Sequence, residues 1–401
     1  MTEWRKRCLG EITSFMSKGI PPKYVERENE NTVRVLNQKC NRNFEINYEE
    51  SRLHDCSKKK VPADKMLQPG DVLINSTGTG TAGRVAQLYD VPTPTTIDGH
   101  MILLRPTEEI DSIYFGYAVK EFQPKIETLA EGSTGQTEIN RKRLQEEIVI
   151  SFPEEKETQK RIARFLLNID EKIKVNGKIN KNLEQQAEAI FQSILSNAVT
   201  TVNLGEIADV KGGKRLPKGV NLIDIPNTHP YIRVRDLNNV LFASITPDYV
   251  YVDEETQKSI SRYIVSTGDV LISIVGTIGL TAIVDSTLDK ANLTENCVKV
   301  TNLKHITPEY LLLYLRSQLG REAITKGTVG AVQQKLPIKN IQAIPIPLLS
   351  EKDKNTLFCT LDSIFDEISS NVIQSAMLSS LRDTLLPRLM SGELDVSDID
   401  L

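Results

Sequence analysis

The sequence has few of the features that mark secreted, membrane-spanning or metal-binding proteins. Its five cysteines are scattered and odd in number, with no C-x-x-C pair, so no disulfide framework or zinc cage is expected. No apolar run approaches the length of about 20 residues that spans a membrane. The opening residues MTEWRKRCLGEI lack the pattern of a signal peptide. We therefore expect a cytoplasmic protein with reduced thiols.

A large excess of one charge is also missing. Lys and Arg number 49 against 53 Asp and Glu, a formal net charge of −4, so a nucleic-acid binder would need local basic clusters or basic partners. Aromatic residues make up 5% of the chain, which is few for a protein that stacks single-stranded bases. The 401 residues and the hydrophobic content of 39% are typical of a globular protein with two or three domains.

Catalytic motifs are absent as well. The sequence contains no G-x-x-x-x-G-K-[ST] phosphate loop, no H-E-x-x-H, no G-x-S-x-G and no Asn-Pro-Pro-aromatic motif for methylating a base. The four histidines, His54, His100, His229 and His305, share no metal-ligand spacing. We predict no catalytic residue, no metal site and no cofactor in this chain.

Two long helical stretches are present instead. Residues 157–195 contain no proline, and their apolar residues recur in alternating steps of four and three, as in a coiled-coil seam over roughly 58 Å. The pattern recurs 195 residues later, and Asn176 is matched by Asn371, a polar seam residue of the kind that fixes helix register. We predict that the helices pair; the alternative is that each only covers its own domain. The predicted seam residues are Ile162, Leu166, Ile169, Ile173, Asn176, Leu183, Ile190, Leu357, Leu361, Ile364, Ile368, Asn371, Leu378 and Leu385.

The globular parts repeat at a similar interval. A period near 196 residues indicates a duplicated unit of one domain plus one helix, not a solenoid. The matched segments are Leu9–Ile12 with Leu204–Ile207, Thr32–Asn37 with Tyr231–Asp236, Pro69–Ile74 with Thr267–Ile272, and Gly80–Gly83 with Gly276–Gly279.

This organisation predicts an α+β fold. We expect two similar mixed α/β domains separated by two long antiparallel coiled-coil helices, as an internal repeat with a pseudo-twofold axis. The expected boundaries are 1–153 for the first domain, 154–200 for the first long helix, 201–349 for the second domain, 350–392 for the second long helix and 393–401 for an acidic tail.

Short elements within the domains follow from local patterns. Residues 111–131 and 307–326 are expected to be helices, and 147–152 and 344–349 are expected to be strands. Proline at 345 and 347 places the last strand at a sheet edge.

The segment Gly78–Gly83 fits G-x-G-x-x-G, and a small-molecule enzyme using this loop is one alternative function. A dinucleotide site would need a helix to begin there, but Arg84–Val91 is more typical of a strand. We therefore interpret the segment as a strand–strand turn with outward Thr and Arg side chains. Asp98-Gly99-His100 suggests an acid–base pair, but the second copy has Leu293-Thr294-Glu295 there, so we interpret it as a surface turn.

Small basic and amide clusters occupy matched positions in the two copies. Such side chains can read base edges or hold phosphates, and recurrence favours this over a solvated loop surface, the alternative for each residue alone. The predicted nucleic-acid contacts are Lys18, Arg34, Asn37, Lys39, Thr77, Thr79, Arg84, Thr134, Gln136, Arg141, Lys214, Arg215, Arg233, Arg235, Gln333, Gln334 and Lys335.

The order of these segments resembles the specificity subunit of a Type I restriction-modification system over essentially the whole chain. The resemblance rests on the Leu-Gly-Glu-Ile openings, the Gly-Asp-Val-Leu-Ile segments, the two long helices, and two motifs in the second copy. These motifs are Ile344–Pro347 before Glu351-Lys352, and Leu385–Leu394. In the first copy, Val149–Pro153 departs from the family's Ile-Pro-hydrophobic-Pro.

The resemblance implies two target-recognition domains, each reading one half of a split site in double-stranded DNA. It implies that the helices set the spacer and dock two methyltransferase subunits, which carry S-adenosylmethionine and methylate adenine. Restriction and translocase subunits would join for cleavage, and no membrane is involved. The half-sites are expected about one helical turn, roughly 10 bp, apart.

The two copies differ in the segments that are expected to contact bases. Because Thr77–Arg84 differs from Ile274–Leu280, and Lys39–Arg42 from Asn238–Leu241, we expect an asymmetric bipartite site. A rival function is a non-catalytic assembly scaffold with no direct DNA role.

Overall fold

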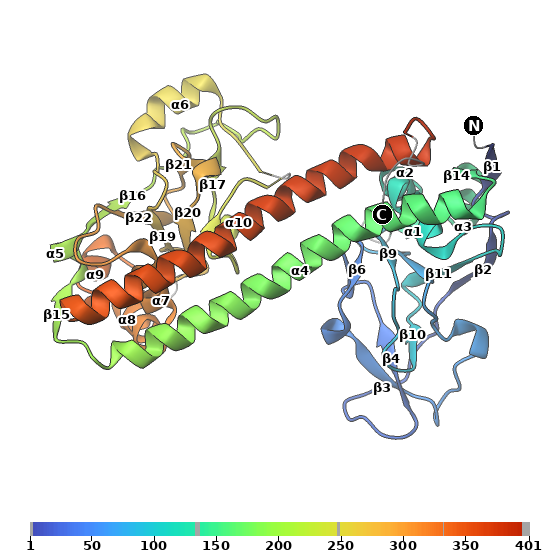
Figure 1. Ribbon diagram of the computed structural model, residues 1–401, viewed down its shortest axis with the longest axis horizontal. Helices are drawn as coiled ribbons and strands as arrows, with labels where there is room; N and C mark the ends of the chain where they lie inside the picture. The colour runs from blue at the N-terminus through green and yellow to red at the C-terminus, as the bar shows by residue number, and fades with distance from the viewer. Residues whose placement is uncertain (1–2, 133–136, 247–248, 332, 395–401) are drawn as a thin grey trace. The chain divides into compact units, whose positions relative to one another are not determined.

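The computed structural model describes residues 3–132, 137–246, 249–331 and 333–394. The chain forms two compact units: unit 1 is Met1–Lys174 with Ser375–Leu401, and unit 2 is Val175–Gln374. Each unit therefore contains one α/β domain and a segment of each long helix, α4 (Lys156–Leu195) and α10 (Glu351–Met390) (Figure 1).

The main sheet of unit 1 is antiparallel, with the strand order β2-β11-β8-β9. Its strands are β2 (Thr13–Lys18), β8 (Val72–Asn75), β9 (Val85–Gln87) and β11 (Met101–Pro106). A second sheet has the order β10-β4-β7-β3, made by β3 (Tyr24–Val25), β4 (Thr32–Leu36), β7 (Arg52–Asp55) and β10 (Thr95–Ile97). Three strand pairs complete the unit: β1 (Trp4–Cys8) with β14 (Val149–Pro153), β5 (Asn41–Arg42) with β6 (Glu45–Ile46), and β12 (Ala130–Glu131) with β13 (Glu138–Ile139).

The main sheet of unit 2 repeats this arrangement in the order β16-β22-β19-β20, with β18 added parallel to β20. Its strands are β16 (Asp209–Gly212), β18 (Phe242–Ala243), β19 (Val270–Ser273), β20 (Thr281–Val284) and β22 (Cys297–Thr301). Two more pairs are β15 (Thr200–Asn203) with β23 (Pro345–Leu348), and β17 (Tyr231–Ile232) with β21 (Asn292–Leu293). Strand β23 pairs with β15 in a two-stranded sheet, so it is an edge strand, as expected. Its prolines lack a backbone N–H, which an edge strand tolerates because it pairs on one side only.

The Gly-Asp turn before each central strand is built in the same way in both units. Gly70 and Gly268 have φ of 91° and 84°, a region that favours glycine. The carboxylate of Asp71 accepts the backbone N–H of Gln68 at 2.8 Å, and that of Asp269 accepts the N–H of Ser266 at 2.9 Å. The strands that follow, β8 and β19, are buried throughout, so the apolar run in the repeated motif forms the centre of each sheet.

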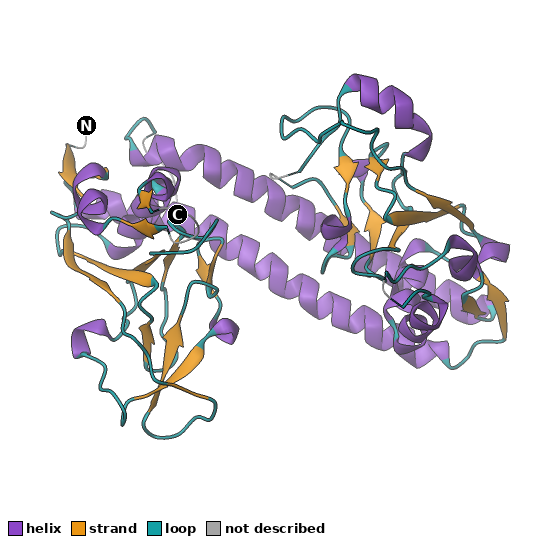
Figure 2. Cartoon of the chain, turned by 180° about the vertical axis from the view of Figure 1, so that it is seen from behind, coloured by secondary structure: helices purple, strands orange, loops and turns teal. Residues whose placement is uncertain are grey.

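Helices pack on each main sheet, next to the long-helix segments (Figure 2). In unit 1 they are α1 (Ser112–Glu121), α2 (Gln123–Thr128) and α3 (Arg141–Glu147). In unit 2 they are α5 (Leu204–Ile207), α7 (Pro308–Arg316), α8 (Gln318–Gly327) and α9 (Ile338–Gln342), whereas α6 (Glu254–Ile260) packs through Ile260 in a separate small cluster with Tyr231 and Val252. Short 3₁₀ turns lie at Tyr48–Glu50, Ala63–Lys65, Val234–Leu237, Ser261–Tyr263 and Ser286–Leu288.

The single helices expected over 111–131 and 307–326 were wrong, because each is two helices. Phe122 has ψ of 2° and ends α1, and a proline follows at the start of α2. Ser317 ends α7 with an extended ψ of 166°, and its hydroxyl accepts the Gly320 N–H to cap α8. Helical periodicity continued across both breaks, so it could not reveal them.

The long helices pair antiparallel within each unit. In unit 2, Asn176 donates to the side chain of Gln374 at 2.8 Å, and Asn371 donates to the side chain of Asn180 at 3.0 Å. Residue numbers therefore rise along α4 as they fall along α10, which is the antiparallel arrangement. In unit 1, Arg382 of α10 meets Asp170 of α4 at 2.5 Å.

The predicted seam residues are all buried or half-buried. The buried ones are Ile162, Leu166, Ile169, Asn176, Leu357, Leu361, Ile368 and Asn371, and the half-buried ones are Ile173, Leu183, Ile190, Ile364, Leu378 and Leu385. Phe191, Phe365 and Leu386 are also buried and join the domain cores, so each helix covers its domain as well as pairing. These three residues were not anticipated, because they lie outside the four-three pattern.

Two similar mixed α/β domains and two long helices confirm the predicted fold class. The domain boundaries stay predictions. Gly392 lies against Trp4, so the end of α10 returns to the start of the chain in unit 1. Of the expected tail at 393–401, residues 395–401 lie outside the described residues. Across the described part of the chain, no helix is long and apolar enough to cross a membrane.

Candidate nucleic-acid interface

Four segments lie side by side at one end of the main sheet of unit 1. They are joined by backbone hydrogen bonds from Gly19 to Met101 (3.2 Å), from Ser76 to His100 (2.8 Å) and from Ile139 to Ser76 (2.8 Å). We call this surface polar end 1, made of residues 18–20, 76–79, 99–100 and 138–139. It gathers three of the predicted contacts, Lys18, Thr77 and Thr79, from separate parts of the sequence.

Polar end 1 is held by side-chain contacts that the sequence did not indicate. Lys18 forms an ion pair with Glu138, and the hydroxyl of Thr77 lies 2.9 Å from Nδ1 of His100. The Asp98 carboxylate accepts the backbone N–H of His100 at 2.9 Å, and burial raises the pKa of Asp98. Gly99 and His100 form a turn and His100 is exposed, but Asp98 is buried, so the interpretation of Asp98 and His100 as a pair of surface residues was wrong for Asp98.

The glycine segment joins antiparallel strands β8 and β9, so the strand–strand turn is confirmed and the helix that a dinucleotide site needs does not follow. Gly78, Gly80 and Gly83 have φ of 112°, 70° and 87°. Thr79 is exposed at the tip. Arg84 was expected to face outward but folds back, donating to the carbonyl of Gly80 at 3.0 Å.

The loop over residues 37–41 lies beside this turn. Asn75 donates to the Gln38 carbonyl at 3.1 Å, and Asn41 donates to the Arg84 carbonyl at 2.9 Å. The Asn37 side chain accepts the Lys39 backbone N–H at 2.9 Å and donates to the Glu50 carbonyl, so Asn37 shapes the loop, while the Lys39 side chain is exposed.

The remaining predicted contacts of unit 1 are dispersed. Arg34 contacts Ser51 at 3.2 Å and Glu28 at 3.8 Å on the second sheet. Arg141 is exposed at the first residue of α3, two residues after polar end 1. Thr134 and Gln136 lie outside the described residues.

Unit 2 forms the equivalent surface at the same end of its sheet. Gly213 donates to Cys297 (3.0 Å), Ile274 to Asn296 (2.8 Å) and Leu336 to Ile274 (3.0 Å). We call it polar end 2, made of residues 213–215, 274–277, 294–296 and 333–336. It gathers the predicted contacts Lys214, Arg215, Gln333, Gln334 and Lys335, all exposed.

An ion pair also marks polar end 2. Nε of Arg215 donates to Oε1 of Glu295 at 2.7 Å, and the hydroxyl of Thr294 donates to Oε2 at 3.1 Å. Burial pushes the pKa of Glu295 upward, but these bonds and a backbone N–H outweigh burial and leave the pKa lowered. Lys214 places its ammonium 5.5 Å from the ring centre of Tyr263, a cation–π contact.

The hydrogen-bond register corrects two predicted matches between the copies. Asp98 corresponds to Thr294 and not to Leu293, and the segment around Arg233 is also shifted. Asp98 N–H bonds the Leu36 carbonyl and Thr294 N–H bonds the Ile232 carbonyl, so Leu36 corresponds to Ile232. Arg233 therefore corresponds to Asn37 and not to Arg34. Sequence similarity alone had shifted this segment by three residues.

Arg233 and Arg235 differ in their surroundings. The Arg233 guanidinium binds Asp236 at 2.9 Å and lies 5.7 Å from the ring centre of Tyr249, so it shapes its loop much as Asn37 does. The Arg235 side chain is 63% exposed and lies 3.8 Å from Asp236, so its guanidinium can reach a ligand.

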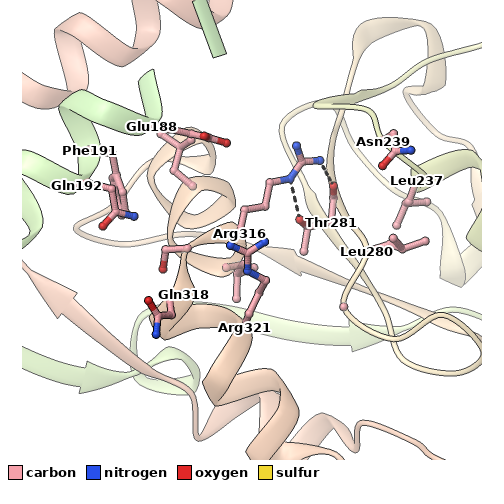
Figure 3. Close-up of a pocket in the computed structure, with 14 residues that line it drawn as sticks. Glu188, Phe191, Gln192, Leu237, Asn239, Leu280, Thr281, Arg316, Gln318 and Arg321 are labelled. Carbon is pink, nitrogen blue, oxygen red and sulfur yellow. Dashed lines mark hydrogen bonds between the residues drawn. The ribbon is translucent and has the colours of Figure 1, made fainter. Parts of the chain in front are cut away.

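A cavity of about 620 Å³ lies elsewhere in unit 2, between α4, the α7–α8 junction and the β19–β20 turn (Figure 3). Arg316 crosses it, donating to the Val240 carbonyl and to the carbonyl and hydroxyl of Thr281 at 2.6 and 3.2 Å. These bonds tie three elements together, which is a structural role. Among residues 3–132, 137–246, 249–331 and 333–394, no group of three or more His, Cys, Asp and Glu side chains could hold a metal ion.

Comparisons with known proteins agree with this duplicated arrangement. The HindI specificity subunit of a Type I restriction enzyme from Haemophilus influenzae is 22% identical over 478 residues, covering 98% of this chain and 100% of the relative. The EcoBI specificity subunit from Escherichia coli is 23% identical over 208 residues, covering 51% of this chain and 41% of the relative. A crystal structure of a Type I restriction-modification S subunit from M. genitalium superposes with a TM-score of 0.58 at 18% identity, covering 97% of this chain and 96% of that one, and so shares the fold.

A family model described as the Type I restriction modification DNA specificity domain matches residues 1–185 and again residues 197–375. These two matches follow the duplication seen in the sequence and in the sheets. The chain therefore belongs to the family of Type I restriction-modification DNA specificity domain proteins.

Proposed function

We propose that this chain is the DNA-recognition subunit of a Type I restriction-modification complex. Each domain would read one half of an asymmetric bipartite site in double-stranded DNA. The observation that supports this most is the recurrence of one surface in two copies with different side chains: Lys18, Thr77 and Glu138 at polar end 1, and Arg215, Glu295 and Lys335 at polar end 2. A shared scaffold with divergent contact residues suits two different half-sites.

The subunit itself would perform no reaction. Two methyltransferase subunits would dock on the paired helices, bringing S-adenosylmethionine and methylating adenine, and restriction or translocase subunits would join for cleavage. Basic surface on these partners would offset the net charge of −4 when the complex closes on DNA. A cytoplasmic location, where such DNA lies, stays a prediction.

The helices would fix the distance between the half-sites. Their antiparallel pairing in both units supports a spacer of set length, with half-sites about one turn, roughly 10 bp, apart. Asn176, Asn180 and Asn371 form a polar layer in unit 2 that would hold the helices in one register.

Sequencing of methylated DNA from cells that express the chain with its methyltransferase tests the proposal. We expect one bipartite motif with methylated adenines and two dissimilar halves. A perfect palindrome would contradict the asymmetry, and methylation without sequence preference would contradict the recognition function. The scaffold alternative predicts that the assembled complex gives no DNA footprint attributable to this chain.

Insertion of one heptad into α4, alone and paired with one in α10, tests the spacer role. We expect the number of unspecified base pairs between the halves to change while both half-site sequences stay the same. A new half-site with the old spacer would contradict the role of the helices.

A further inference from the structure

Each polar end carries one carboxylate among its cations. At polar end 1 it is Glu138, bound to Lys18, and at polar end 2 it is Glu295, bound to Arg215. Carboxylates repel phosphates, so acidic side chains on a surface that meets DNA need a reason to be there.

Glu295 is held in a fixed position with acceptor capacity remaining. Arg215 occupies one lone pair of Oε1, Thr294 one of Oε2 and a backbone N–H a third, whereas an ionised carboxylate offers about four acceptor sites. Its side chain is 30% exposed, so the carboxylate stays accessible from the surface. The lowered pKa keeps it ionised near neutral pH.

The arrangement around the carboxylate selects what it can bind. Arg215 offsets its charge against neighbouring phosphates and keeps free N–H groups on a guanidinium that is 81% exposed. A carboxylate only accepts hydrogen bonds, and the donors that DNA presents in the major groove are the amino groups N4 of cytosine and N6 of adenine.

We infer that Glu295 is a specificity-determining residue that accepts a hydrogen bond from the amino group of a cytosine or adenine in the half-site of the second domain. This rests on the proposed function. Arg215 is its positioning residue and contributes a phosphate contact. Glu138 has the same relation to Lys18 at polar end 1, but it occupies the place of Lys335 and not of Glu295. The two half-sites would then present amino groups at different positions.

The test uses the chain assembled with its methyltransferase subunits and a set of duplexes in which each base pair of the methylated motif is changed singly. For Glu295→Gln, we expect the preference at one base pair of one half-site to fall by roughly 5- to 150-fold. The other half-site should be unaffected. For Arg215→Ala, we expect weaker binding of all sequences, a salt dependence reduced by about one phosphate, and a smaller loss of preference at the same base pair that Glu295→Gln affects.

Asp209→Asn is the matched control, because Asp209 is an exposed carboxylate paired with Lys211 at 3.1 Å at the opposite end of the same two strands. It should leave every preference unchanged. An unchanged ranking of duplexes for Glu295→Gln, or an equal loss for all of them with an unchanged melting temperature, would overturn the role of Glu295. A wild-type complex that fails to distinguish the duplexes would instead overturn the proposed function.

Discussion

The two units differ sharply where the long helices meet beneath each domain. In unit 1, Asp170 of α4 forms an ion pair with Arg382 of α10 and accepts the hydroxyl of Tyr117 at 2.6 Å. At the same positions along the helices, 195 residues away, unit 2 has Phe365 and Ala187, which join a continuous apolar core. Phe365 also meets Phe242 of its domain edge-on at 6.0 Å.

This difference shows that one scaffold accepts a polar or an apolar contact at the same place. A buried ion pair adds little net stability compared with a well-packed apolar pair, but leaving one partner alone is costly. The ion pair therefore favours packing of the start of α4 against the end of α10 in unit 1. The apolar pair favours packing of the end of α4 against the start of α10 in unit 2. Replacing one residue of either pair with the residue at the equivalent position of the other unit should therefore lower the stability of the unit that carries the change.

The largest effect is expected from placing the unit 1 acid in unit 2. Phe365→Asp would bury an unpaired carboxylate at a position that is 2% exposed, and should destabilise unit 2 by about 4 kcal/mol or more. Hydrogen exchange of β19 and β22 in increasing urea measures this. Asp366→Asn, at an exposed neighbour, is the control. Protection of β19 and β22 that matches the wild type would break the comparison.

Removing one partner of the unit 1 pair should have a smaller but large effect. Asp170→Ala removes the acceptor of the Tyr117 hydroxyl and one of the two carboxylates bound to Arg382. Because Arg382 keeps Asp383 at 2.8 Å, the change should cost about 2 to 3 kcal/mol. The fluorescence of Trp4, the single tryptophan, reports on unit 1 during urea unfolding. The double change Asp170→Phe with Arg382→Ala places the residues of the unit 2 pair in unit 1, and should recover most of the lost stability. A double variant as weak as the single one would show that the contacts are not equivalent.

A second contrast concerns a basic residue in the last turn of the equivalent helices α1 and α7. Their register is set by Tyr114 and Tyr310, whose hydroxyls donate to Ser151 and Pro347, each 196 residues apart. By this register, Lys120 corresponds to Arg316. Arg316 is bound by carbonyls, whereas the Lys120 ammonium has no hydrogen-bond partner among the described residues and lies 4.4 Å from the ring centre of Phe44.

Burial lowers the pKa of Lys120 from 10.5 to about 8. The charge of Arg382 also lowers this pKa, whereas Asp170, Asp383 and Glu45 raise it and offset part of the shift. Below pH 8 the folded chain buries the charge, and between pH 8 and 10.5 only the unfolded chain keeps the proton, so the stability of unit 1 rises with pH. Lys120→Met should stabilise unit 1 at pH 7 by roughly 1–3 kcal/mol, with the gain shrinking as the pH approaches 10.5. A gain that is constant from pH 7 to 10, measured by Trp4 fluorescence in urea, would contradict this account.

The smallest effect is expected at Gly177, whose counterpart in α10 is Val372. A Cβ added at Gly177 meets no atom within 4 Å, so Gly177→Ala should stabilise α4 by up to about 1 kcal/mol. Thermal unfolding followed by circular dichroism measures it. A lower melting temperature would mean that the glycine is needed for a bend or a partner contact.

Much of the scaffold could be predicted because it depends on patterns along the sequence. The four-three spacing from Ile162 and the Gly-Asp turns at Gly70 and Gly268 are local signals. Each signal occurs in both copies of the repeat, so one copy supports the prediction made from the other. Phe365 escaped prediction because it lies between the seam and the solvent face, and only the domain beneath it explains its burial. The breaks at Phe122 and Ser317 escaped because apolar periodicity continued across them.

The polar ends were less predictable for a different reason. Lys18 and Arg215 could be chosen by residue type, but their partners Glu138 and Glu295 are 120 and 80 residues away in sequence and occupy different places in the two copies. Only the register of the sheets brings them together. That register also showed that Arg233 corresponds to Asn37, which similarity of letters had obscured.

The division of the chain has a consequence for its synthesis. Unit 2 is continuous from Val175 to Gln374, whereas the core of unit 1 is completed by Leu386, Leu389 and Met390 near the end of the chain. Most of the first domain is therefore synthesised early, but the residues of α10 that complete its core are synthesised after the whole of unit 2. The second domain can thus finish folding before the first. A stop codon shortly after Gln374 would leave the later-made domain whole and expose the apolar surface of the earlier one.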